Sequence, residues 1–396
     1  MNKFTLLLIG LFAINNAVNA QWTAVNNGLP NSGTNTDVES FAYISANLFA
    51  ATSSGVYMTG NNGGIWTGVN SGITNTDIEA LAAVGPYLFA GTGHGIFMSS
   101  TSGTSWNAVN TGLDTSMGTS VYALFADGTN LFAGTEAGVF LTSTYGTSWT
   151  GVNTGLPKLD FYAFAKCGSY IYSGGFGVYQ KPTSGASWSE LTSGLPPLLD
   201  SDFESFAVSG TNVFAGDLGG GVYWSNTDGA SWSAVNTNLT NLHVHALAVS
   251  GSKLFAGTDG GVFLSTNLGA DWTAVNTGLT DLNVQSLEVF GSNLFAGTGN
   301  GVFVAPLSSL AGINETENED MHISIFSNPC NGTFQISNDA SEVMQVELFD
   351  VTGESVLQKE LCSGTNQMDI SNLPNGIYIV KFTAFKGSFE KKLIKE

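Results

Sequence analysis

A sevenfold repeat occupies residues 21–307 and leaves few folds open to this chain. Each unit carries one glycine–aliphatic–aromatic triplet, such as Gly55-Val56-Tyr57, and one run similar to Leu-Phe-Ala-Gly-Thr. The first unit predicts four short strands, at roughly 38–45, 47–52, 55–59 and 65–69. A four-stranded repeat of about 40–45 residues is typical of a propeller blade. The most regular marker is a tryptophan that recurs every 39 to 44 residues: Trp22, Trp66, Trp106, Trp149, Trp188, Trp232 and Trp272.

The two ends of the repeat region complement each other. A strand at 22–25 comes before any complete unit, and the last unit stops after its third strand, near Val304. We therefore expect the N-terminal strand to complete the last blade and to close the ring. Because a single blade cannot bury both of its faces, the blades must stack. Residues 21–307 are predicted to form a seven-bladed β-propeller in an all-β chain.

The charge of the chain excludes several partners. Charged residues make up only 11% of the sequence, all 11 basic residues are lysines, and the net charge is −20. Binding to a phosphate backbone needs a cationic surface, so we expect no nucleic-acid partner. Attraction to an anionic membrane surface is excluded by the same argument.

The N-terminus has the features of a secretory signal. Lys3 precedes a short apolar run from Phe4 to Ala13, and Val18 and Ala20 provide the small residues of a cleavage site. We expect residues 1–20 to be removed during export. The apolar run is shorter than the ~20 residues that a membrane-spanning helix needs.

The turn before most of the tryptophans resembles the Asp-box of the bacterial neuraminidase (BNR) repeat family, Ser/Thr-x-Asp-x-Gly-x-x-Trp. Examples are TGNNGGIW (59–66) and SNTDGASW (225–232). The resemblance implies a structural turn rather than a reactive group. It also suggests a sialidase, but that family binds its substrate carboxylate with three arginines, and this chain has none. The position of the aspartate is degenerate: Asn61, Thr101, Thr144, Thr183, Thr227 and Asn267.

The C-terminal part differs from the repeats. Residues 308–320 form an acidic stretch that we interpret as a linker. Residues 321–396 alternate as about seven short strands and predict a small Ig-like β-sandwich. Three segments, SNPCNGTFQIS (327–337), VELFDVTGESV (346–356) and 369–396, resemble the C-terminal sorting domain of the type IX secretion system of Bacteroidota, with Ser327 where a proline is usual.

The resemblance to a sorting domain has consequences for localisation and partners. It implies passage through the periplasm and the outer membrane, with the secretion machinery as a partner of residues 321–396. It also implies removal of the tail, followed by release or by attachment to surface lipopolysaccharide. The alternative is an Ig-like module without a sorting role.

Cysteine and histidine spacings give little evidence of chemistry. Cys167 is predicted to be a buried apolar residue in the fourth blade. Cys330 and Cys362 could pair in an oxidising compartment, and the sequence leaves this open. His243 and His245 share one face of a strand, but no third ligand for zinc is evident.

Polar residues stand where each innermost strand of the propeller begins. We expect the loops that join the second and third strands to contribute to the same end: His94, Glu136, Asp217, Asp259 and Asn300. Alignment of the units gives a first ring of Asp37, Asp77, Ser120, Asp160, Asp202, His243 and Asn283. Two residues further on, a second ring contains Glu39, Glu79, Tyr122, Tyr162, Glu204, His245 and Gln285. We call these two sets together the axial ring.

The axial ring predicts a binding site, because convergent polar groups at a concave end are the usual location of one. Asp200, Asp202 and Glu204 alternate and could supply oxygens to a calcium ion; no other cofactor is indicated. The alternative is that these acids are solvated loop ends that keep the strand edges soluble.

Three functions remain after these exclusions. We favour a non-catalytic binding protein with an extracellular glycan or protein ligand, because the blades are short and near-identical. The second is a glycoside hydrolase that uses Glu39, Glu79 or Glu204 with a neighbouring aspartate. The third is the assembly-factor propeller of photosynthetic membranes, which has similar repeats; the sorting tail and the absence of arginine weigh against it.

Overall fold

The computed structural model describes residues 20–30, 36–113, 120–157, 160–197, 201–310, 323–326, 330–338, 344–350, 354–361, 364–384 and 387–395. They form two compact units, one before and one after residue 312. Every element of these residues is a β-strand. Within the described ranges, no helix has the length and apolarity that crossing a membrane requires.

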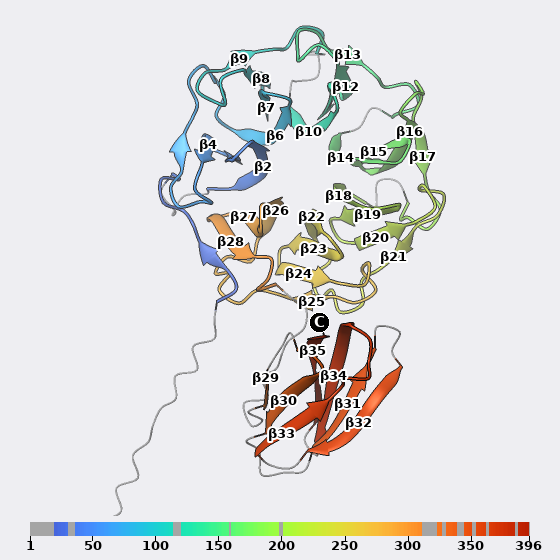
Figure 1. The fold of residues 1–396 in the computed structure, drawn as a ribbon. Coiled ribbons are helices and arrows are strands. Elements are labelled where there is room, and N and C mark those ends of the chain that lie inside the picture. The colour runs from blue at the N-terminus through green and yellow to red at the C-terminus, as the bar shows by residue number, and fades with distance from the viewer. Residues whose placement is uncertain are drawn as a thin grey trace, which may run out of the picture. The chain divides into compact units, whose positions relative to one another are not determined.

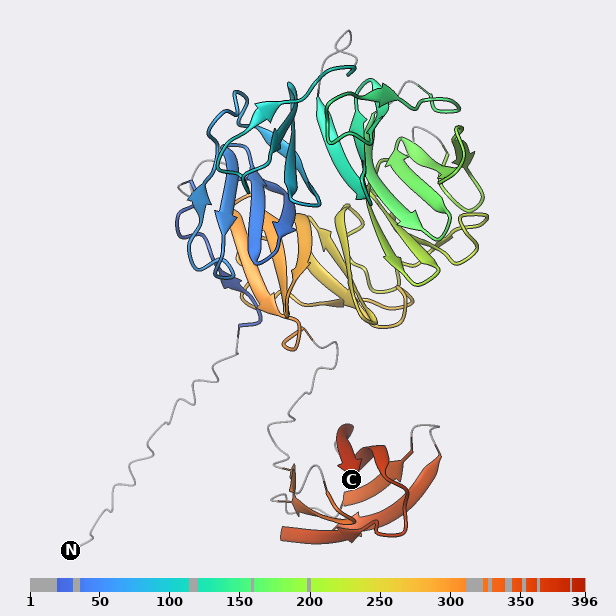
Figure 2. The ribbon, with the colours of Figure 1, turned by 45° about the horizontal axis from the view of Figure 1, so that its top comes forward.

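The first unit consists of seven antiparallel sheets of four strands each, arranged in a ring (Figures 1 and 2). Blades 1 and 2 contain β2 (Val38–Ile44), β3 (Asn47–Thr52), β4 (Gly55–Thr59), β5 (Thr67–Gly68), β6 (Ile78–Val84), β7 (Tyr87–Thr92), β8 (Gly95–Ser99) and β9 (Asn107–Ala108). Blades 3 and 4 contain β10 (Val121–Asp127), β11 (Asn130–Thr135), β12 (Gly138–Thr142), β13 (Thr150–Gly151), β14 (Phe161–Cys167), β15 (Tyr170–Gly175), β16 (Gly177–Pro182) and β17 (Ser189–Leu191).

Blades 5 and 6 repeat the arrangement with β18 (Phe203–Ser209), β19 (Asn212–Asp217), β20 (Gly221–Ser225), β21 (Ser233–Ala234), β22 (Val244–Ser250), β23 (Lys253–Thr258), β24 (Gly261–Ser265) and β25 (Thr273–Ala274). Blade 7 contains β26 (Val284–Phe290), β27 (Asn293–Thr298), β28 (Gly301–Pro306) and, as its outermost strand, β1 (Thr23–Ala24). The predicted closure is confirmed, since Thr23 pairs with Val304 and Ala24 with Phe303.

The blades are held together by apolar side chains that fill the space between neighbouring sheets. The second strand of each blade is buried on both faces, and its aromatic residue packs on the next blade. This residue is Tyr172 in blade 4 and a phenylalanine in the other six; Phe49 of blade 1 shares a core with Leu81 and Trp106 of blade 2. The repeated tryptophans also bond across the blades. The indole N–H of Trp106, for example, donates to the carbonyl of Val69 in blade 1 at 2.7 Å.

The second unit is a small sandwich of two antiparallel sheets. One contains β29 (Ile323–Phe326), β30 (Thr333–Asn338) and β33 (Gly364–Asp369). The other has the order β32 (Ser355–Leu361), β31 (Met344–Phe349), β34 (Gly376–Ala384) and β35 (Gly387–Lys395). Residues of both sheets, such as Phe334 and Val346, share one buried core. The predicted fold class, all-β with a propeller and a C-terminal sandwich, is confirmed.

Some sequence predictions fall outside the described residues. These are most of the signal segment, most of the acidic linker, Asp200 and Cys362. The exact domain boundaries and the pairing of Cys330 with Cys362 therefore stay predictions. Cys167 is buried at the end of the innermost strand of blade 4, as expected.

Candidate functional site

The axial ring lies at one end of the innermost strands. Each first-ring residue stands directly before such a strand, and each second-ring residue is the second residue within it. The innermost strands of neighbouring blades contact one another around the propeller axis (Figure 1). The register predicted from the repeats therefore brings these side chains from all seven blades to the same end of the propeller.

A β-bulge positions every second-ring residue. In blade 1 the pairing shifts between Val38 and Ser40, so Glu39 is the extra residue. The same shift occurs at the matching place in the other six blades. A bulge leaves one residue unpaired and redirects its side chain. The residue at the bulge can therefore differ from blade to blade, while the rest of each innermost strand keeps its apolar packing.

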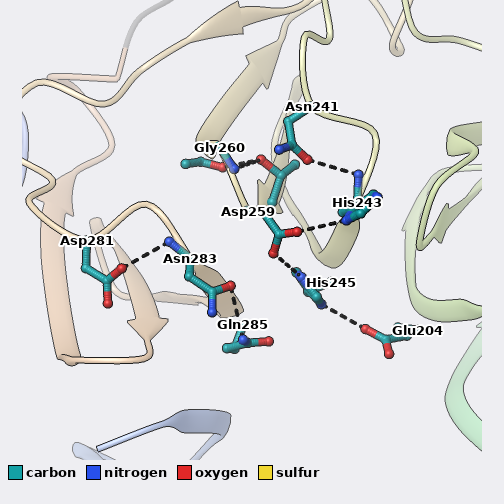
Figure 3. Close-up of polar contacts among 11 residues, drawn as sticks. Glu204, Asn241, His243, His245, Asp259, Gly260, Asp281, Asn283 and Gln285 are labelled. Atoms are coloured by element: carbon teal, nitrogen blue, oxygen red, sulfur yellow. Dashed lines mark hydrogen bonds and ion pairs between the residues drawn. The ribbon is translucent and has the colours of Figure 1, made fainter. Parts of the chain in front are cut away.

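Three axial residues of blades 5 and 6, Glu204, His243 and His245, are joined with Asp259 of the neighbouring loop in one hydrogen-bonded network (Figure 3). His245 Nδ1 lies 2.9 Å from Glu204 Oε2, and His245 Nε2 lies 2.8 Å from Asp259 Oδ1. The other oxygen of Asp259 lies 2.8 Å from His243 Nδ1. Burial lowers the pKa of His245, but the hydrogen bonds with the two carboxylates outweigh it and raise that pKa above its ordinary value. An imidazolium held between two carboxylates is therefore favoured.

Blades 3 and 4 form an aromatic group beside this network. The rings of Tyr122 and Tyr162 lie 5.2 Å apart, and Phe176 packs edge-on against Tyr162 at 6.2 Å. The Tyr162 hydroxyl donates to Asp160 at 3.2 Å. Burial, with the charges of Asp160 and Asp202, raises the pKa of Tyr162, so its hydroxyl stays a donor. Aromatic faces beside hydrogen-bonding groups suit a ligand that has both apolar and polar surfaces.

The pKa is raised in four described carboxyl groups of the ring, and in Glu39, Glu79 and Asp202 the rise is large. Desolvation raises the pKa of Glu39 to about 7, assisted by the charges of Asp37 and Glu204. Desolvation and the charge of Asp77 raise the pKa of Glu79 to about 7. Burial, together with Glu204, raises the pKa of Asp202 to about 6. Near neutral pH these groups are partly protonated, and each can donate as well as accept a hydrogen bond.

The structure adds residues that the alignment of the units did not single out. Asn75, Asn241 and Asp281 each stand two residues before a first-ring residue and accept its backbone N–H. The sequence could have indicated these three residues, because Asn and Asp favour turns in which the side chain bonds to the backbone two residues later. Phe176 was missed because its loop is one residue shorter than the loop of five other blades.

The predicted calcium ligands are only partly placed. Asp200 lies outside the described residues, and Glu204 is engaged by His245. Within the described part of the chain, no three His, Cys, Asp or Glu side chains come together as metal ligands.

Two family models match parts of the chain. Residues 324–396 match the secretion system C-terminal sorting domain. Residues 169–292 match the DUF6242 beta-propeller domain. The comparison with curated proteins found no match.

Solved structures share the fold at low identity. PorZ of Porphyromonas gingivalis, described as an essential surface component of the type IX secretion system, is 16% identical, with a TM-score of 0.54 over 91% of this chain and 59% of that chain. YCF48 bound to a D1 peptide is 14% identical, with a TM-score of 0.57 over 72% of this chain and 97% of that chain. An ancestral GH74 enzyme is 16% identical, with a TM-score of 0.57 over 92% of this chain and 63% of that chain.

These likenesses establish the fold and leave the activity undecided, because propellers of this kind include enzymes and non-enzymes. The chain spans 59% of the length of PorZ and 63% of that of the GH74 enzyme. The match of the tail is informative about location. A type IX sorting domain directs a chain to the cell surface or beyond it, and this chain carries one.

Proposed function

We propose that this exported propeller is a non-catalytic binding protein that recognises a glycan or a protein outside the cell with its axial ring. The observation that carries the proposal is the division of the ring into two adjacent groups. Tyr122 and Tyr162 offer aromatic faces, and the Glu204–His245–Asp259 network offers charged and polar groups. A scaffold built from similar blades with a varied ring at one end is suited to recognition.

The network itself argues for binding rather than turnover. Both ring nitrogens of His245 are engaged by carboxylates, so neither is free to accept a proton from a substrate. Asp259 is held by two histidines, whose hydrogen bonds lower its pKa against the opposing effect of burial. A general base needs a pKa near the working pH, and Asp259 is shifted away from it.

Binding to glycan arrays and to extracellular proteins tests the proposal. We expect a ligand whose affinity falls at least about fivefold in Tyr162→Ala, because loss of one stacking face costs about 1 kcal/mol or more. Tyr145→Ala is the matched control, since Tyr145 is an exposed tyrosine in the turn before the outermost strand of blade 3. Equal losses in the two variants would contradict a site at the axial ring.

A glycoside hydrolase is the second candidate, and the raised carboxyl pKa values favour it. Glu39 and Glu79, each with a pKa of about 7, resemble the protonated general acid that such enzymes need. The GH74 likeness shows that an enzyme can share this fold, although at 16% identity.

A turnover screen separates the two candidates. Hydrolysis of a polysaccharide that is lost in Glu39→Gln, Glu79→Gln or Glu204→Gln would establish the enzyme and end the purely binding proposal. Stoichiometric binding with no product over a long incubation would end the enzymatic one.

A further inference from the structure

One buried position in the repeat changes its chemistry in blade 5. The second strand of each blade ends at this position. In five blades this position is a threonine. In blade 1 the hydroxyl of Thr52 donates to the carbonyl of Gly55 and accepts the backbone N–H of Ser54, and the other four threonines form the same two bonds. The other four are Thr92, Thr135, Thr258 and Thr298. Blade 5 has Asp217 there, with 2% of its surface exposed.

The carboxylate of Asp217 is only partly satisfied. Asp217 Oδ1 accepts the N–H of Gly220 at 3.0 Å, and the carboxylate also accepts the backbone N–H of Asp202. Asp217 Oδ2 is buried and has no hydrogen-bond partner within the described residues. The turn from Asp217 to Gly221 is one residue longer than the turn from Thr52 to Gly55. A buried, ionised carboxylate oxygen without a hydrogen-bond partner destabilises the folded protein unless a positive charge or a proton compensates it.

Two further oxygens beside Asp217 are in the same condition. Asp202 Oδ1 and Ser201 Oγ are buried and lack a partner among the described residues. Ser201 is 5% exposed. The carboxylate of Asp217 touches the backbone of Asp202 and raises the pKa of its carboxyl group, so the two acids are neighbours, and Ser201 directly precedes Asp202 in the chain. Burial is the largest cause that raises the pKa of Asp202, and the charges of Glu204 and Asp217 add to it.

No described basic side chain compensates these two acids. Lys166 pairs with Asp127, Lys253 donates to the carbonyl of Leu307, and Lys181 lies over the rings of Phe132 and Trp188. His245 is bonded to Glu204 and Asp259. The charge of these two acids is therefore compensated by protons or by a cation that the described chain does not supply.

We propose that the carboxylates of Asp202 and Asp217, with the hydroxyl of Ser201, bind a calcium ion at the entrance of blade 5. The donors are all hard oxygens, which Ca²⁺ prefers, and Ca²⁺ accepts irregular geometry and completes its shell with backbone carbonyls and water. Two carboxylates suit the weaker sites of extracellular modules, with dissociation constants on the order of 0.1–1 mM. Only Asp202 is shared with the set predicted from the sequence, in which Asp200 and Glu204 stood where Asp217 and Ser201 now stand. The inference does not rest on the proposed binding function.

Thermal unfolding of the full chain tests the site. We expect calcium at ten to a hundred times the dissociation constant to raise the Tm by about 3–6 °C over the value in chelator. Asp217→Thr should abolish this shift. It should also fold, because it restores the residue of five other blades. In chelator, Asp217→Thr should be at least as stable as the unmodified chain, since it removes an unsatisfied carboxylate.

Asp281→Asn is the matched control. It removes one negative charge at the same end of the propeller, but both oxygens of Asp281 are already bonded, to the N–H of Asn283 and to the side chain of Asn300. Asp281→Asn should keep the calcium shift, and equilibrium dialysis should give one ion per chain. The proposal is overturned if calcium leaves the Tm unchanged, if Asp217→Thr keeps the shift, or if sodium at matched ionic strength produces it.

Discussion

At the scale of single residues, the seven repeated tryptophans occupy the same position in each blade but do not all form the same hydrogen bond. Six of the seven indole N–H groups donate to a carbonyl of the preceding blade, at 2.6 to 2.8 Å. Trp232 is equally buried, yet its indole N–H has no partner within the described residues. The outer strand that it faces ends in Leu191, where all six other blades have valine. Blade 4 is therefore the exception that weakens the contact with blade 5.

This difference predicts unequal costs for one substitution. Trp106→Phe should destabilise the propeller by about 1 kcal/mol more than Trp232→Phe, because only the first variant loses a hydrogen bond and leaves the Val69 carbonyl without its partner. Urea denaturation of both variants measures the difference. Equal free energies of unfolding would show that the indole N–H contributes nothing to the contact.

Glu288 is a second residue that departs from its repeat. Burial raises its pKa to about 7. The matching positions are occupied by Ala42, Ala82, Phe125, Ala165, Ala207 and Ala248. A carboxyl group whose folded pKa lies above its unfolded value binds more protons in the folded state, so stability falls as the pH rises from about 4.5 to about 7.

We therefore expect Glu288→Ala to stabilise the propeller at pH 8 by about 1–3 kcal/mol. Near pH 4 the gain should disappear, because the carboxyl is then protonated in both states. Denaturation midpoints at the two pH values measure this. A gain that is the same at both would mean that packing, and not ionisation, is responsible.

At the scale of elements, the turn that links neighbouring blades limits what the repeat can change. Asn70 Oδ1 accepts the N–H of Val56 at 2.7 Å and so fixes the start of the third strand. Two residues later, Gly72 has a φ of 97°, and a Cβ there would lie 2.2 Å from the carbonyl oxygen of Trp106. Blade 5 has Asn238 at this position, with a φ of 63°. The left-handed backbone conformation is thus also present in blade 5, where asparagine replaces the glycine.

Two glycines with similar backbone angles should respond differently to alanine. Gly112 has a φ of 90° and would place a Cβ 2.2 Å from the carbonyl oxygen of Trp149, whereas Gly128, at 64°, has open space around it. Gly128→Ala should cost about 1–2 kcal/mol, the strain of the left-handed conformation. Gly112→Ala should cost more than about 3 kcal/mol, because a backbone clash is added. Similar losses in thermal unfolding would show that the turn can move.

The repeat explains which parts of the fold and of the site could be predicted. Strand positions, blade number and the axial ring follow from register, which the sequence displays directly. The contacts between side chains of the ring could not be predicted from register. His245 meets Glu204 of the preceding blade and Asp259 of its own, and no repeat predicts rotamers that converge from different blades. The burial of Asp217 was hidden for the same reason, since the alignment marks a changed residue but not its lost partners.

At the scale of the whole molecule, stability depends on the strand that closes the ring. β1 supplies the outer edge of blade 7, and Trp66 of blade 1 bonds to the carbonyl of Val25 just after it. Deletion of residues 21–30 should lower the Tm of the propeller by more than 10 °C and cause aggregation, because β28 becomes an exposed edge. Deletion of residues 323–396 is the control and should leave the propeller transition in place. A propeller that unfolds normally without β1 would show that closure is dispensable.

The pairing of Thr23 with Val304 also has a consequence for the time course of biosynthesis. The first strand of the propeller to be made pairs with the last one, after every other blade has been made. Contacts between such distant segments form slowly. β1 lacks its partner until β28 has been made, and the edges of these two strands also fit those of a second unfinished copy. We expect copies that meet before closure to exchange β1 and to form linked chains.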